Sequence, residues 1–203
     1  MPLSGNPILA AEPGRTVEES KLAGVVGTGF RLGPDVLVTC WHCVQNENYA
    51  YVLTRGEEEG GAVVYPLTQV AQDANGTDLA TAKIDEDLTT DVSLRLRLSD
   101  LAAPAARNVW TFGYPLPSPV RRDDGKQRVE IDTRVLRGYL TRSFRYEHPI
   151  YGATPSYEID MPAPAGLSGA PLMLDPDREV IGVMYGENDV ETIEAFATID
   201  PET

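Results

Sequence analysis

The chain has 203 residues, of which 42% are hydrophobic, and its formal net charge is −14 at neutral pH. This length is enough for one large or two small hydrophobic cores, and the composition is ordinary for a soluble globular protein. The negative charge repels phosphate backbones and anionic lipid surfaces, so we expect neither nucleic acids nor membranes among the partners.

The composition also bears on location and fold class. Residues 1–14 lack the basic start and the long apolar run of a secretory signal. No segment approaches the roughly 18 consecutive apolar residues of a membrane-spanning helix. We therefore expect a cytoplasmic protein. The 18 glycines and 16 prolines make turns frequent and long helices scarce, which favours an all-β fold.

Strand patterns alternate with turns along most of the chain. Residues 1–21 are poorly periodic, and we expect an arm there with a short helix at 17–22. Residues 55–61 and 115–125 are rich in charge or proline and are expected to form loops. Strands are predicted at residues 22–30, 36–39, 49–54, 62–70, 78–84, 95–98, 108–114, 129–146 (two strands, bent at Gly138), 157–160, 180–185 and 195–199.

The stretch at residues 27–44, GTGFRLGPDVLVTCWHCV, holds the first candidate functional residue. Two apolar strands separated by a Gly-Pro-Asp turn predict a β-hairpin. His42, one of only two histidines, directly follows the second strand. A histidine held by a strand end and projecting into a cleft can act as a general base. Taken alone, the pattern also fits a histidine packed at a strand end without chemistry.

Two later stretches supply an acid and a nucleophile. Asp78 opens the apolar run DLATAKI, and Ser168 stands between glycines in GLSGAPL. Asp73 is a competing acid, but the residues that follow it are typical of a turn. A serine hydroxyl becomes a nucleophile only when a base removes its proton, so the three residues together predict nucleophilic catalysis. Without the other two, the serine stretch would fit a turn before a strand.

Together these motifs resemble those of the chymotrypsin/trypsin-like serine proteases. VTCWHCV resembles the family's TAAHC motif, DLA its D-(I/L/V)-A motif, and GLSGAPL its GDSGGPL motif. NVWTFGYP resembles the stretch that opens the second barrel in compact bacterial intracellular relatives. The resemblance implies two antiparallel six-stranded β-barrels with the active site in the cleft between them. Residues 22–100 would form the first barrel and residues 101–203 the second, after an N-terminal arm at 1–21.

The resemblance also implies a role for each candidate residue. Ser168 would be the nucleophile, His42 the base and then the acid, and Asp78 the residue that orients the imidazole. The backbone N–H groups of Gly166 and Ser168 would form the oxyanion hole. The substrate pocket would be small and apolar, and its positions are Pro162, Ala163, Val183, Met184, Tyr185 and Gly186. The implied partners are a protein or peptide substrate and a fused or associated regulatory domain, with no cofactor and no metal.

Three positions depart from the family pattern. Leu167 stands where secreted members carry the aspartate that pairs with a new N-terminus, so activation by N-terminal insertion is not expected. Ala170 replaces the second glycine of the serine motif. Cys43 matches a half-cystine whose partner would lie at residues 27–30, where there is no cysteine, so we expect that disulfide to be absent.

Other readings of the sequence stay open. Cys40 and Cys43, the only cysteines, have the C-x-x-C spacing of dithiol oxidoreductases, but the motif ends a β-hairpin and no second ligand pair for zinc follows. A catalytically silent binding or effector module would share the fold. A hydrolase of small esters would use the same three residues. His148, beside Pro149 in a loop, has no acid or serine near it in sequence, and we expect no role for it.

Overall fold

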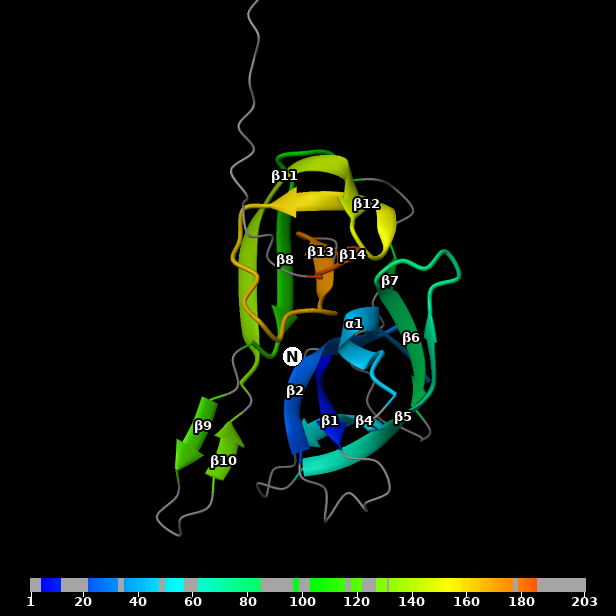
Figure 1. Cartoon of the computed structure of the whole chain (residues 1–203). Coiled ribbons are helices and arrows are strands. Elements are labelled where there is room, and N and C mark those ends of the chain that lie inside the picture. The colour runs from blue at the N-terminus through cyan, green and yellow to red at the C-terminus, as the bar shows by residue number, and fades with distance from the viewer. Residues whose placement is uncertain are drawn as a thin grey trace, which may run out of the picture.

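A computed structural model describes residues 5–11, 22–32, 35–47, 50–56, 62–84, 97–98, 103–115, 118–121, 127–130, 132–176 and 179–185. These residues form two β units that lie next to each other, with one short helix near their junction (Figure 1). That helix, α1 (Trp41–Val44), is the only one in this part of the chain and is far too short to cross a membrane. The prediction of an all-β fold is confirmed.

The first unit is a closed barrel in which every neighbouring pair of strands is antiparallel. Around the barrel the strand order is β1-β2-β3-β6-β5-β4. The strands are β1 (Gly5–Ala11), β2 (Leu22–Arg31), β3 (Val36–Cys40), β4 (Ala50–Gly56), β5 (Ala62–Gln72) and β6 (Leu79–Ile84). Five of these strands were predicted from the sequence at nearly the same positions.

Strand β1 corrects the expectation of an arm. Its residue Ile8 pairs with Gly27 of β2 on one side and with Leu53 of β4 on the other, so β1 closes the barrel. The stretch GNPILAA contains glycine, proline and small residues, which weaken a strand signal. Closure nevertheless buries Ile8, Leu9 and Ala10 to 3% exposure or less. The helix predicted at 17–22 lies outside the described residues except for Leu22, which begins β2.

The second unit is a six-stranded sheet in the order β12-β11-β8-β13-β14-β7. Among the described residues its strands do not close on themselves, and its edge pair β14–β7 is parallel. The strand predicted at 195–199 lies outside the described residues. The strands are β7 (Arg97–Leu98), β8 (Asn108–Gly113), β11 (Arg134–His148), β12 (Gly152–Ile159), β13 (Pro171–Leu174) and β14 (Glu179–Val183).

Strand β11 is continuous, so the predicted division at Gly138 is wrong. Its first part pairs with β8 and its second part pairs with β12, with a register shift after Leu140. A side chain at Gly138 would lie 2.6 Å from Asp160 Oδ1, and Asp160 accepts a hydrogen bond from the neighbouring Tyr139 N–H. The glycine therefore makes room for this carboxylate rather than ending the strand.

A two-stranded ribbon projects beside the two units (Figure 1). It consists of β9 (Ser118–Arg121) and β10 (Gln127–Glu130), which pair antiparallel. The prediction of a loop at residues 115–125 is therefore wrong for the residues of β9. The proline in β9 and the charged residues around it weaken the strand pattern in the sequence, so the pattern does not predict this ribbon.

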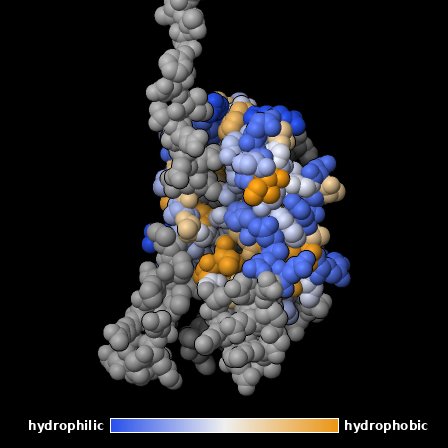
Figure 2. Space-filling model, in the orientation of Figure 1, coloured by the Kyte–Doolittle hydropathy of each residue, from blue (hydrophilic) through white to orange (hydrophobic). Residues whose placement is uncertain are grey.

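The hydrophobic core has one part inside each unit and a third part between them. Phe30 and Val38 of the first unit pack with Phe112, Met173 and Val180 of the second, all at most 5% exposed. On the face shown in Figure 2, hydrophobic residues form small separate spots among hydrophilic ones. The buried contact between Phe30 and Val38 and the residues of the second unit fixes the position of one unit relative to the other. This position determines how residues of the two units meet at the candidate site.

Candidate active site

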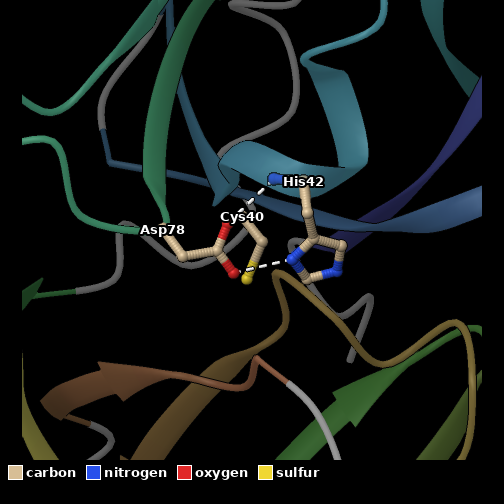
Figure 3. A group of neighbouring side chains, drawn as sticks. All are labelled: Cys40, His42 and Asp78. Carbon is tan, nitrogen blue, oxygen red and sulfur yellow. Dashed lines mark hydrogen bonds and ion pairs between the residues drawn. The ribbon is translucent and has the colours of Figure 1, made fainter. Parts of the chain in front are cut away.

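His42 and Asp78 meet at one end of the first barrel. Strands β3 and β6 pair with Cys40 opposite Leu79, and the Trp41 N–H after β3 donates to Asp78 O at 3.0 Å, so His42 in α1 lies beside Asp78 (Figure 3). The Asp78 carboxylate accepts the His42 backbone N–H at 2.8 Å through Oδ1 and bonds to His42 Nδ1 at 2.6 Å through Oδ2. One carboxylate thus fixes both the main chain and the ring of His42.

The electrostatics of this pair favour the imidazolium. Burial alone would lower the pKa of His42, but the hydrogen bonds and charges of Asp78 and Cys43 outweigh it and raise the pKa from 6.5 to about 10. The His42 side chain is 34% exposed, whereas that of Asp78 is only 11% exposed. The ring is therefore accessible to solvent, whereas its Nδ1 faces Asp78.

Asp73, the competing acid, has a different task. Its Oδ2 accepts hydrogen bonds from the Asn75 backbone N–H and from the Thr77 hydroxyl, both at 3.1 Å. These bonds stabilise the turn that leads into Asp78 and β6. Asp73 therefore supports the loop and does not meet His42.

Ser168 lies in the loop between β12 and β13, and a residue of the first barrel holds this loop. Thr28 of β2 is fully buried; its backbone N–H donates to Ser168 O at 2.8 Å, and its hydroxyl donates to Gly166 O at 2.7 Å. The same hydroxyl accepts the Tyr114 backbone N–H at 3.2 Å. Thr39 of β3 donates to Thr28 O at 2.9 Å. Sequence reasoning missed Thr28 and Thr39, because their partners are distant in the chain.

The two glycines of the serine loop are sterically required. Gly166 has φ +97°, and a side chain there would lie 2.6 Å from Tyr114 O. Gly169 has φ +87°, and a side chain there would overlap Thr28 O and the Thr39 hydroxyl. Both backbone conformations are costly for residues with a Cβ atom. The motif therefore fits the close approach of the loop to β2, β3 and the end of β8.

The predicted oxyanion-hole groups lie on this restrained loop. Among the described residues, the backbone N–H groups of Gly166 and Ser168 donate no hydrogen bond to another backbone group. Three consecutive carbonyls are held: Gly166 O and Ser168 O by Thr28, and Leu167 O by the Ala170 N–H at 2.8 Å. Two available donors on a restrained loop are what stabilisation of an oxyanion requires.

The Ser168 hydroxyl is turned toward Tyr185. Its Oγ makes a long contact of 3.5 Å to Tyr185 O, and the described residues include no hydrogen bond between Ser168 and His42. The thiol of Cys43, the residue after His42, lies 3.8 Å from Ser168 O. The structure therefore brings Ser168 beside the helix that carries His42, with the hydroxyl directed elsewhere.

The predicted pocket positions differ in their exposure. Pro162 is exposed, Ala163, Val183 and Tyr185 are half-buried, Met184 is buried, and Gly186 lies outside the described residues. The Met184 side chain packs in the core of the second unit. Its carbonyl accepts the Gly169 N–H at 2.6 Å and the Cys40 thiol at 3.3 Å. Met184 therefore supports the serine loop through its main chain.

Leu167 and the cysteines agree with the expected departures from the family pattern. Leu167 is 1% exposed in the core of the second unit, where it cannot make an ion pair. Cys40 and Cys43 are free, and a side chain at Gly27 would lie 2.6 Å from Cys43 Sγ, so the glycine occupies the place of a disulfide partner. Burial, together with the charges of Cys43 and Asp78, raises the pKa of Cys40 well above 9.0. A dithiol oxidoreductase needs the opposite, a thiolate of lowered pKa.

His148 belongs to an aromatic group near the site. Its ring lies 4.6 Å from that of Tyr151 and 6.3 Å from that of Tyr185, and Tyr146 completes the group. His148 Nδ1 accepts the backbone N–H of Ile150 and of Tyr151, which shapes the turn after β11. Burial and the nearby Asp78 carboxylate raise the pKa of Tyr151. No local motif indicates this approach of Tyr151 to Asp78, because the two residues are distant in the chain and only the fold brings them together.

Comparison with known proteins agrees with this architecture. Residues 27–183 match the family model of the trypsin-like peptidase domain. The fold is similar to an inactive form of Rv3671c from M. tuberculosis, a serine-to-alanine mutant, with a TM-score of 0.60, 22% identity, and coverage of 90% of this chain and 74% of that chain.

Two further structures are similar in fold. They are Deg5 (TM-score 0.57, 19% identity, coverage of 89% and 78%) and the HtrA-type protease AlgW with a tripeptide (TM-score 0.58, 17% identity, coverage of 89% and 50%). No curated protein sequence matches the chain significantly. The predicted chymotrypsin-like fold is confirmed.

Proposed function

Because the chain belongs to the trypsin-like peptidase domain family, we propose that it is a serine endopeptidase acting through Ser168, His42 and Asp78. The observation that carries the proposal is the pair of hydrogen bonds that the Asp78 carboxylate accepts from His42, at 2.6 and 2.8 Å, beside the loop that holds Ser168. This carboxylate orients the imidazole so that Nε2, and not Nδ1, is available as the base.

Catalysis begins when the Ser168 hydroxyl turns from Tyr185 O toward His42 Nε2. Its oxygen attacks the substrate carbonyl carbon while Nε2 takes the proton. The N–H groups of Gly166 and Ser168 stabilise the oxyanion, and loss of one such donor typically slows the reaction by about 10²–10³-fold. His42 then gives the proton to the leaving amine. In the second half of the reaction His42 takes a proton from water, the water oxygen attacks the acyl carbon, and His42 returns the proton to the Ser168 oxygen as the ester bond breaks.

Activation and specificity follow from the surroundings of the serine. With Leu167 in the core, a newly formed N-terminus has no carboxylate to bind there, so activation takes another route, such as a partner or an associated domain. The half-buried Ala163 and Val183 support a small or medium apolar side chain as the preferred substrate residue before the cleaved bond. The proposed substrate is therefore an uncharged segment of a protein or peptide.

The test is covalent labelling with a fluorophosphonate probe, located by peptide mass spectrometry. We expect the probe on Ser168 in the wild type, and its loss in Ser168→Ala and in His42→Ala. Ser143→Ala, which changes an exposed serine of β11, is the matched control and should label like the wild type. Labelling that survives in His42→Ala, or that falls on another serine, would overturn the assignment.

One observation favours a second candidate, a catalytically silent binding module. The Ser168 hydroxyl faces Tyr185 O and not His42, so the three residues do not form a continuous hydrogen-bonded chain. The same experiment separates the two functions. A folded wild type that stays unlabelled at neutral pH and near pH 10, where about half of His42 is deprotonated, and also with candidate partners or associated domains present, would support the binding module.

A further inference from the structure

Cys40, His42 and Asp78 are side chains of the kinds that bind zinc, and they lie close together. Cys40 Sγ, a ring nitrogen of His42 and an Asp78 carboxylate oxygen all lie within 4.8 Å of one another, and His42 Nδ1 is the nitrogen that faces Asp78 (Figure 3). Thiolate sulfur, imidazole nitrogen and carboxylate oxygen are the ligands that Zn²⁺ takes in proteins. No second cysteine pair in the sequence indicates this site, because the fold supplies the third ligand, Asp78, from the residue before β6.

We propose that Cys40, His42 and Asp78 bind Zn²⁺ and that the bound ion switches off the base. Water would complete the tetrahedral shell. The binding of the ion depends only on these three side chains, whereas its inhibitory effect rests on the proposed peptidase function. The two parts can therefore be tested separately.

The geometry needs only a small rearrangement. Two nitrogen or oxygen ligands of tetrahedral zinc lie about 3.4 Å apart. His42 Nδ1 and Asp78 Oδ2 are 2.6 Å apart, so the ring and the carboxylate must separate by less than about 1 Å. The bond from His42 N–H to Asp78 Oδ1 at 2.8 Å can persist and keep the carboxylate in place. On losing its proton, Cys40 gives up the hydrogen bond that its thiol donates to Met184 O at 3.3 Å.

The charge of the site also favours a dication. Asp78 is 11% exposed and Cys40 is fully buried, so a thiolate formed at Cys40 beside the Asp78 carboxylate is costly unless a cation compensates both charges. The whole chain carries a net charge of −14, which attracts cations to its surface. A zinc ion would replace the proton shared by the pair with a stronger positive charge.

Inhibition follows from which ring nitrogen the metal takes. Zinc on Nδ1 leaves the single imidazole proton on Nε2, because a neutral imidazole carries one proton on the nitrogen that is not coordinated. Nε2 then cannot accept the proton of Ser168. The thiol and the imidazolium must release protons on binding, so affinity rises with pH.

The first test measures metal binding without any substrate. Co²⁺, a spectroscopic substitute for Zn²⁺, is expected to give a thiolate-to-cobalt charge-transfer band that added Zn²⁺ displaces. Cys40→Ser should lose the band and weaken zinc binding by about 100-fold or more, since a direct ligand matters at least as much as its outer-shell partners. Cys43→Ser, which keeps all three ligands, is the matched control and should bind zinc as the wild type does.

Two further readouts keep the test decisive. X-ray absorption of the zinc-loaded wild type should show one sulfur ligand among nitrogen or oxygen ligands, whatever the folding of the variants. In a peptidase assay, zinc should inhibit the wild type and Cys43→Ser reversibly, and Cys40→Ser only at far higher concentration relative to its own metal-free rate. A shell without sulfur, or equal zinc affinity in Cys40→Ser, would overturn the site. Binding without inhibition would overturn the switch alone.

Discussion

The two halves of the candidate site are held in different ways. His42 and Asp78 both belong to the first barrel, and two direct hydrogen bonds between them set the geometry. Ser168 belongs to the second unit, but Thr28 of the first barrel binds the carbonyls on either side of Leu167. The base is therefore arranged within one unit, whereas the serine loop depends on the contact between two.

This difference predicts which substitutions should affect the base and which should affect the serine loop. Changes to the contact between His42 and Asp78 should alter the base without moving the serine loop. Changes at the junction of the units should move the loop and leave the base intact. The buried cluster of Phe30, Phe112 and Met173 lies at the same junction, so the loop depends on docking as well as on its own hydrogen bonds.

The largest expected loss of activity comes from a substitution in the His42–Asp78 pair. Asp78→Asn removes the charge that stabilises the imidazolium and permits the wrong ring tautomer, so kcat should fall by about 10⁴-fold. Peptide hydrolysis measured beside Asp73→Asn checks this, because Asp73 only supports the adjoining turn. A comparable loss in both variants would show that the fall comes from a damaged turn and not from His42.

The next effect concerns the pH dependence of the base. His42 is active only when neutral, and its pKa is raised from 6.5 to about 10, so activity should increase with pH up to about pH 10. Below that pKa the neutral fraction changes about tenfold per pH unit. NMR titration of the imidazole, together with the pH–rate profile, measures both quantities. In Asp78→Asn the titration midpoint should move down toward 6.5; an unchanged midpoint would contradict the role given to Asp78.

A substitution that weakens the contact between Thr28 and the serine loop should reduce activity less than Asp78→Asn does. Thr28→Val keeps the shape of the side chain but leaves Gly166 O and the Tyr114 N–H without their partner, which destabilises by about 1–3 kcal/mol per buried group. If the loop shifts, kcat/KM should fall by about 10²–10³-fold, the usual value of one oxyanion donor. Thr28→Ser retains the hydroxyl and should recover most of the activity.

The His42 titration gives a second readout for the same change. It should be the same in Thr28→Val as in the wild type, because the base lies in the other half. A shifted titration would show that the two halves are not separable.

The smallest effect is expected at Thr39. Thr39→Val removes one hydrogen bond, to Thr28 O, and should lower the free energy of unfolding by about 1 kcal/mol. Chemical denaturation measures this change, and kcat/KM should change less than in Thr28→Val. A larger loss of activity than in Thr28→Val would mean that Thr39, and not Thr28, is the main support of the loop.

Local motifs predicted much of this molecule. His42, Asp78 and Ser168 each stand in a short stretch with its own strand or turn pattern, and most strands of both units follow from alternation. Thr28 was described only as a strand residue, because its partner Gly166 is 138 positions away and only the fold joins them. Tyr151 near Asp78 was missed for the same reason.

Strands with weak intrinsic signals were also missed. Residues 5–11 contain glycine, proline and alanine, and barrel closure rather than propensity makes them a strand. The opposite error occurred at Gly138, where a residue typical of a bend lies inside a continuous strand. In both places tertiary contacts override the local preference.

The closure of the barrel by β1 has a consequence for synthesis and folding. β1 pairs with β2 and with β4, so until residues 50–53 have left the ribosome, one edge of β1 has no strand to pair with. Exposed edges of this kind can recruit strands of other chains. Such non-local pairing also slows folding, since the loop must close before the contact is made. The first barrel of the nascent chain can therefore close only after β4 is available to pair with β1.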